Sequence, residues 1–72
     1  MEKLDLHGMR HCFVEAALIR KVEELWNTDT ELVIVTGMSD EMKRIVREVL
    51  DEYELEYTEG DQYNNGYIKT IV

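Results

Sequence analysis

The chain has 72 residues, of which 44% are hydrophobic and 33% charged, and its formal net charge is −8. This length holds one small domain, and so acidic a chain is not a general nucleic-acid binder, because such proteins attract phosphates with a basic surface. No apolar run approaches the roughly 20 residues of a membrane span, and the lone Cys12 excludes an intrachain disulfide, so we expect a cytoplasmic protein that does not bind membranes.

The charge is unevenly distributed along the chain. Residues 1–47 hold nine acidic and seven basic residues, whereas residues 48–72 hold seven acidic residues and one basic residue. We therefore expect any anion-binding surface in the first two thirds of the chain. The acidic last third is typical of a solvated face, and it also suits a basic partner.

A short strand is predicted at residues 3–7, where leucines alternate with Asp5 and His7. One face of this strand is apolar, and the other face carries a carboxylate and an imidazole. Gly8 then allows the backbone to turn sharply. Apolar residues recur at helical spacing after this turn, and they predict a helix at residues 10–26.

The second predicted strand is the continuous apolar run at residues 32–35, which is typical of a buried central strand with a parallel neighbour. A loop with one glycine, Gly37, follows at residues 36–40. Ser39 or Asp40 is suited to cap the next helix. That helix is indicated by five apolar residues at positions i, i+3, i+4, i+7 and i+8, namely Met42, Ile45, Val46, Val49 and Leu50.

Alternating apolar and polar residues predict a half-exposed strand at residues 53–58. A last strand is predicted at residues 67–72, after the polar loop 59–66. The predicted order is therefore β-α-β-α-β-β. Because crossover connections between parallel strands are right-handed, both helices should cover one face of a mixed four-stranded sheet. The predicted fold class is α/β, a two-layer sandwich formed by a single domain of residues 1–72.

The loops after the first two strands are expected side by side at one end of the sheet. Gly8 and Gly37 each precede a helix N-terminus, where backbone N–H groups and the helix dipole attract anions. Together with Asp5 and His7, these two turns predict a phosphate site. The basic residues expected near this site are Arg10, Lys43 and Arg44.

Asp5 and His7 suit two different roles. In phosphodiester cleavage, His7 would exchange a proton with a hydroxyl, water or the leaving oxygen, and Asp5 would orient the imidazole. In the structural alternative, both side chains cap the strand–helix turn by bonding to backbone amides. A zinc or manganese site with His11 is weaker, because His7 precedes the helix and the two histidines then lack helical i, i+4 geometry. We expect no metal and no cofactor, and a solvated His11 near phosphate.

Residues 4–8, Leu-Asp-Leu-His-Gly, resemble the motif that opens the small MutS-related (Smr) domain. Residues 33–37, Val-Ile-Val-Thr-Gly, resemble the strand that leads into the glycine loop of this family, and residues 66–72 resemble its glycine-led last strand. The predicted element order is also that of the family, whose fold resembles the C-terminal domain of a bacterial translation initiation factor. The resemblance covers nearly the whole chain.

This resemblance implies nucleic-acid binding and endonuclease activity, because members of the family nick DNA or cut mRNA, in some cases on stalled ribosomes. We expect RNA to be slightly favoured over DNA as the partner. Asp5 and His7 match the residues implicated in cleavage. Nucleic acid is expected to contact residues of both turns and of the helices that follow them, namely Gly8, Arg10, His11, Thr36, Gly37, Lys43 and Arg44.

One position departs from the family pattern, because the second motif usually reads Thr-Gly-x-Gly and Ser39 stands where its second glycine would be. A Cβ there keeps phosphate away from the backbone, and Asp40 adds a repelling charge. This departure and the net charge of −8 favour a non-catalytic interaction module, whose acidic last third binds a basic protein or a ribosomal partner. Intact Asp5 and His7 favour the nuclease. A metal-dependent hydrolase that also uses His11 is the weakest of the three hypotheses.

Overall fold

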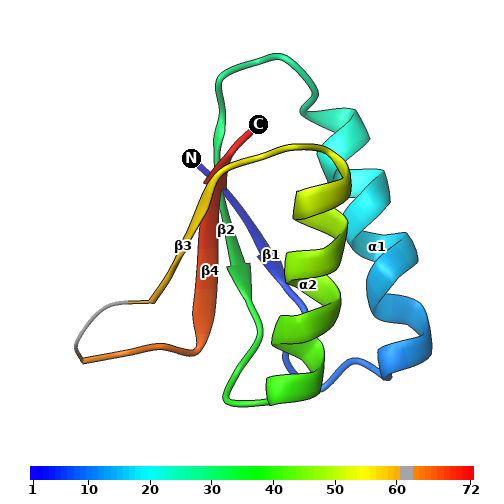
Figure 1. The fold of residues 1–72 in the computed structure, drawn as a ribbon, viewed down its shortest axis with the longest axis vertical. Helices are drawn as coiled ribbons and strands as arrows, with labels where there is room; N and C mark the ends of the chain where they lie inside the picture. The colour runs from blue at the N-terminus through cyan, green and yellow to red at the C-terminus, as the bar shows by residue number, and fades with distance from the viewer. Residues whose placement is uncertain (61–62) are drawn as a thin grey trace.

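The computed structural model describes residues 1–60 and 63–72, and this part of the chain forms four strands and two helices in the predicted order. The elements are β1 (Glu2–Asp5), α1 (His11–Glu24), β2 (Glu31–Val35), α2 (Asp40–Glu52), β3 (Tyr57–Glu59) and β4 (Tyr67–Ile71). The strands form one sheet in the order β1-β2-β4-β3, and both helices cover the same face of it (Figure 1). The predicted two-layer α/β sandwich is confirmed.

The sheet is mixed because it contains both parallel and antiparallel pairs of strands. β1 and β2 are parallel neighbours joined by α1, whereas β4 pairs antiparallel with both β2 and β3. Asp5 is opposite Val35 in the register, so β1 and β2 end at the same level of the sheet. At this level the chain enters the two turns that precede α1 and α2.

The core lies between the helices and one face of the sheet. Its largest fully buried aliphatic side chains are Leu6, Leu18, Leu32, Ile34, Leu50 and Ile68. Because both helices lie on the same side, Val33 and Val35 on the other face of β2 are only half-buried. β2 is therefore central and parallel to β1, as predicted, but it is buried on one face rather than on both.

The strand predicted at residues 53–58 begins four residues too early, because the turn that ends α2 and the link to β3 occupy residues 53–56. The strand starts only at Tyr57. The turn before it is a Schellman motif, in which the Leu55 N–H donates to the Leu50 carbonyl at 2.9 Å and Glu54 takes a left-handed φ of 58°. A left-handed residue cannot belong to an extended strand, so the alternating pattern is interrupted here.

α1 ends two residues before the predicted limit of residue 26. Asn27 and Asp29 then take left-handed φ angles of 64° and 57°, which asparagine and aspartate tolerate better than most residues.

The predicted loop 59–66 includes residues 61 and 62, which lie outside the described residues. Neither helix of the described chain has the length and hydrophobicity needed to cross a membrane.

Candidate functional site

The turns after β1 and β2 meet at the end of the sheet where α1 and α2 begin (Figure 1). Gly8 and Gly37 adopt positive φ angles of 82° and 67°, a conformation that favours glycine. The imidazole of His7 lies against the backbone of Gly37, where an added Cβ would stand 2.7 Å from His7 Cδ2. The structure therefore brings His7, Gly8 and Gly37 together, as the parallel pairing of the two strands predicts.

Asp5 acts on the first turn through the backbone. Its Oδ1 accepts a hydrogen bond from the His7 N–H at 3.0 Å, two residues along the chain. This is the local bond that aspartate side chains make in turns. Among the described residues, no hydrogen bond joins the carboxylate to the imidazole. Asp5 therefore holds the turn that carries His7, and both residues remain exposed to solvent.

His11 lies at the junction of the two helices. It is the first residue of α1, and its Nε2 lies 3.5 Å from the hydroxyl oxygen of Ser39, the N-cap of α2. The Ser39 hydroxyl also accepts the Met42 N–H at 3.2 Å, so it caps α2 as the sequence predicts. The described residues contain no group of three acidic, histidine or cysteine side chains placed to hold a metal ion. The geometry thus gives no support to a metal-dependent hydrolase.

The two helix N-termini are not equivalent, contrary to the expectation that both attract anions. α1 begins after Arg10 with no side-chain cap and no acidic residue in its first turn. α2 begins with the Ser39 cap, and Asp40 and Glu41 place negative charge in its first turn. A helix end attracts anions through unsatisfied N–H groups and the positive end of its dipole. At α1 the Phe13 N–H donates to the Arg10 carbonyl at 2.9 Å, so each helix has one of its first N–H groups bonded and the two differ mainly in charge. The open N-terminus, in the sense that it lacks an acidic first turn, is that of α1.

Of the three basic residues expected at the site, Arg10 alone presents to solvent a charge that is not ion-paired within the described chain. Arg44 forms ion pairs with Glu41 and with Glu48, the latter at 2.7 Å. The hydrogen bond to Glu41, and then the one to Glu48, raise the pKa of Arg44 further above its usual high value. Lys43 is 7% exposed and lies on the buried side of α2. The positive charge expected from α2 is therefore neutralised or buried within it.

Gly66, the residue that opens the glycine-led last strand of the family pattern but was not among the expected site residues, helps to build the second turn. Its carbonyl accepts hydrogen bonds from the backbone N–H groups of Thr36 and Gly37, both at 2.9 Å, and from the Thr36 hydroxyl at 3.2 Å. Thr36 is 1% exposed, so its side chain ties this turn to the start of β4 and does not face solvent. The available signal was the turn sequence before β4, in which Asn64 Oδ1 accepts the Gly66 N–H at 2.9 Å.

The fold matches that of a solved structure, although no protein-family model and no curated protein matches the chain. The match is to the crystal structure of the human small-MutS related domain, with a TM-score of 0.63 and 24% sequence identity. It covers 97% of this chain and 99% of that one. The chain has the fold of a small-MutS related domain. In this Smr fold, residues 4–8 form the end of β1 and the turn toward α1, and residues 33–37 form most of β2 and enter the second turn.

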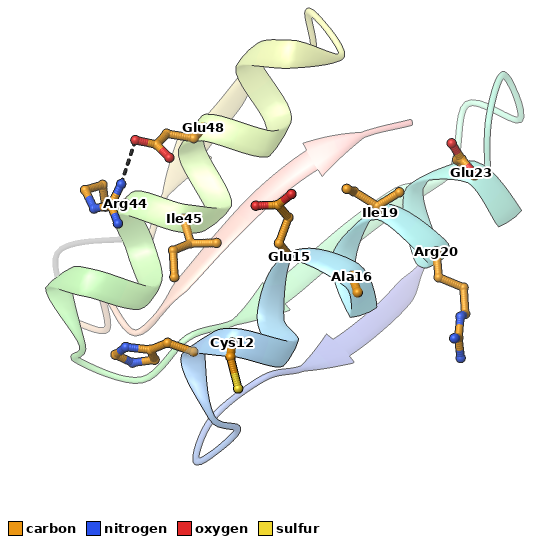
Figure 2. A pocket seen from close by; sticks show the side chains of 10 residues that line it. Cys12, Glu15, Ala16, Ile19, Arg20, Glu23, Arg44, Ile45 and Glu48 are labelled. Carbon is orange, nitrogen blue, oxygen red and sulfur yellow. Dashed lines mark hydrogen bonds and ion pairs between the residues drawn. The ribbon is translucent and has the colours of Figure 1, made fainter.

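A groove of about 800 Å³ lies between α1 and α2 of this Smr fold. Figure 2 shows Glu15 on the side of α1 that faces α2, and Arg44 of α2 joined to Glu48 on the same helix. The groove reaches the glycine turns only through His11, which lines one end of it. It is therefore separate from the surface that carries the catalytic candidates.

Proposed function

We propose that the chain is an Smr-type domain that binds nucleic acid at the turns after β1 and β2, with RNA slightly favoured over DNA. One observation carries this proposal: the His7 imidazole lies against Gly37, at the end of the sheet where the open N-terminus of α1 begins. A side chain suited to proton transfer and a helix end that attracts anions thus share one exposed surface. The Smr fold and the motif at residues 4–8 support the same proposal.

Phosphate would be held by the start of α1 rather than by a broad basic surface. The N–H groups of His11 and Cys12 precede the first bond of α1, which the Phe13 N–H donates to the Arg10 carbonyl at 2.9 Å, and Arg10 supplies a positive charge directly before them. Because Arg10 is the one exposed and unpaired base among the three expected at this site, on a chain with a net charge of −8, few counterions would be released on binding. Affinity is therefore expected to be weak at physiological salt, with a shallow dependence on salt concentration.

We infer that cleavage, the finer part of this proposal, uses His7 as a general base. His7 would accept the proton of a ribose 2′-hydroxyl as that oxygen attacks the adjacent phosphorus. The bond to the 5′-oxygen then breaks, and the leaving oxygen takes a proton from water. Asp5 would act as a positioning residue, since its bond goes to the His7 backbone. The 2′-hydroxyl is present in RNA and absent from DNA, which gives the preference for RNA a chemical basis.

Incubation of the purified chain with labelled single-stranded and duplex RNA and DNA, with and without divalent metal, tests both parts. We expect single-stranded RNA to be bound at low salt and cut. Asp5→Ala should lower both the binding and the cleavage of RNA, because the turn that carries His7 loses the hydrogen bond from its N–H to the Asp5 carboxylate. Asp5→Asn should keep most of the activity, because an amide oxygen still accepts the His7 N–H. A chain that binds none of these nucleic acids at low salt would contradict the proposal.

A non-catalytic module is the second candidate, and the closed N-terminus of α2 favours it. Ser39 caps this helix, and Arg44 is ion-paired within it, so the second turn offers little to a phosphate. Such a module would keep the same fold and bind a basic protein or a ribosomal partner through its acidic last third. No variant of it would cut nucleic acid, so the cleavage assay separates the two candidates.

A further inference from the structure

A second hollow, of about 540 Å³, lies at the end of the sheet far from the glycine turns. Glu31 at the start of β2 pairs with Ile71 at the end of β4. On the other side of β4, the Thr70 hydroxyl donates to the Glu56 carbonyl at 2.6 Å and fixes the chain that leads into β3. Ile71 is thus flanked by a glutamate on each side, on the face of the sheet that no helix covers.

The exposed apolar side chain of this hollow is Ile71. Ile71 is 60% exposed, and Leu55 and Tyr57, whose side chains pack against the core, also line the hollow. An exposed apolar surface rimmed by polar groups is a common feature of protein interaction sites. A partner that covers Ile71 would remove its apolar surface from water and thereby gain free energy.

The rim of the hollow is acidic. It includes Glu31, Glu54 and Glu56, and none of these carboxylates forms an ion pair with another described residue. Lys69 is the one basic residue that lines the hollow. Lysine or arginine side chains brought to this rim would therefore meet three unpaired carboxylates, whereas an acidic segment would be repelled.

We propose that this acidic corner, formed by Glu31, Glu54, Glu56 and Ile71, binds an extended basic segment of another protein. The segment places an aliphatic side chain on Ile71 and basic side chains against the three glutamates. The acidic corner and the second glycine turn lie at opposite ends of β2. Binding at the corner therefore leaves the nucleic-acid site open, and the two proposals are tested independently.

An NMR titration of the isotope-labelled chain with a short capped peptide that alternates lysine with leucine tests this proposal. We expect shift changes grouped at Glu31, Glu56 and Ile71, with little change at Gly8 and Gly37. Peptides with glutamate in place of lysine, or with serine in place of leucine, should not bind, because the first is repelled and the second lacks the apolar contact. Absence of binding by the lysine–leucine peptide, or shift changes centred elsewhere, would overturn the proposal.

Two double variants of equal net charge sharpen the test. Glu31→Gln with Glu56→Gln should weaken the binding of the lysine–leucine peptide about tenfold, because two rim carboxylates lose their charge. Glu15→Gln with Glu24→Gln, both on α1 in the other layer, should change it by less than about twofold. Ile71→Ser should weaken binding while circular dichroism stays unchanged, because this side chain is exposed. Equal weakening by the two double variants would show unspecific attraction and overturn the proposal.

Discussion

Two helices begin at the candidate site, and their N-termini differ in side-chain capping and in the charge of the first turn. Each helix follows a parallel strand and a glycine with positive φ. α2 has a side-chain cap in Ser39 and balances its dipole with Asp40 and Glu41. α1 has no side-chain cap and no acidic residue in its first turn, and its Phe13 N–H is bonded to the Arg10 carbonyl. A repeated strand–glycine–helix pattern therefore does not create two equal anion sites. The capping residue and the charge of the first turn are what distinguish the two helix N-termini.

The largest effect that separates catalysis from anion binding is expected at His7. His7→Ala should lower the cleavage of single-stranded RNA by about 10²–10⁴-fold, because the general base is lost. Binding should stay nearly unchanged, because the N-terminus of α1 and Arg10 are kept. Single-turnover gel assays and fluorescence anisotropy measure the two quantities separately. Cleavage by His7→Ala at the rate of the unaltered chain would remove this histidine from the mechanism.

Two glycine variants compare the turns themselves. Gly37→Ala places a Cβ 2.7 Å from the His7 ring, so the imidazole must move, whereas no described atom lies within 4 Å of a Cβ at Gly8. Positive φ should cost each variant about 1–2 kcal/mol of unfolding free energy. Cleavage should fall a further tenfold or so in Gly37→Ala alone, since the base is displaced. Thermal melts and single-turnover rates test this, and equal rates for the two variants would contradict it.

Two arginine variants test which helix holds the phosphate. Arg10→Ala should lower the affinity for single-stranded RNA about fivefold, because the open N-terminus loses its adjacent charge. Arg44→Ala should have little effect, since Glu41 and Glu48 already neutralise this side chain. Arg20→Ala, exposed farther along α1, controls for the loss of one positive charge. Anisotropy at low salt measures all three, and an Arg44→Ala defect equal to that of Arg10→Ala would show that α2 binds phosphate.

The smallest expected effect comes from removing the side-chain cap at the N-terminus of α2. Ser39→Gly removes the oxygen that accepts the Met42 N–H, yet glycine is tolerated at an N-cap, so stability should fall by only a few tenths of a kcal/mol, at about the detection limit. RNA affinity should rise about two- to threefold as backbone N–H groups become accessible. Ser39→Ala should cost about 1 kcal/mol without this gain, because its Cβ remains. If neither variant gains affinity, Asp40 and Glu41 suffice to keep α2 closed.

The fold was largely predictable because the patterns of apolar residues that determine it lie within single helices and strands. The apolar stripe of α2 and the crossover through α1 leave few ways to bury an apolar face. The end of α2 was not predictable, because Glu54 occupies the left-handed position that glycine usually takes. Without a glycine to stop the helix, the alternation in residues 53–58 resembles a strand. A single backbone angle thus accounts for the error.

The location of the candidate site was easier to predict than its chemistry. Parallel strand ends place His7 at the second turn whatever side chains surround it. The partners of those side chains depend on small differences in distance, and Asp5 reaches the backbone of His7 rather than its ring. The pairing of Arg44 was available from the sequence, because Glu41 and Glu48 lie at i−3 and i+4 on the same helix. The sequence did not indicate whether Asp5 would bond to the backbone N–H of His7 or to its imidazole.

β4 is synthesised after the other three strands of this sheet, yet it lies between β2 and β3. Before residues 67–71 leave the ribosome, β2 has one unpaired edge and β3 has no neighbour in the sheet. α1 and α2 form through local contacts, but the complete sheet does not, so cooperative stability is gained only after β4 has emerged. During this interval the apolar edge of β2 is a template for pairing with other chains, and shielding of the nascent chain would limit its aggregation.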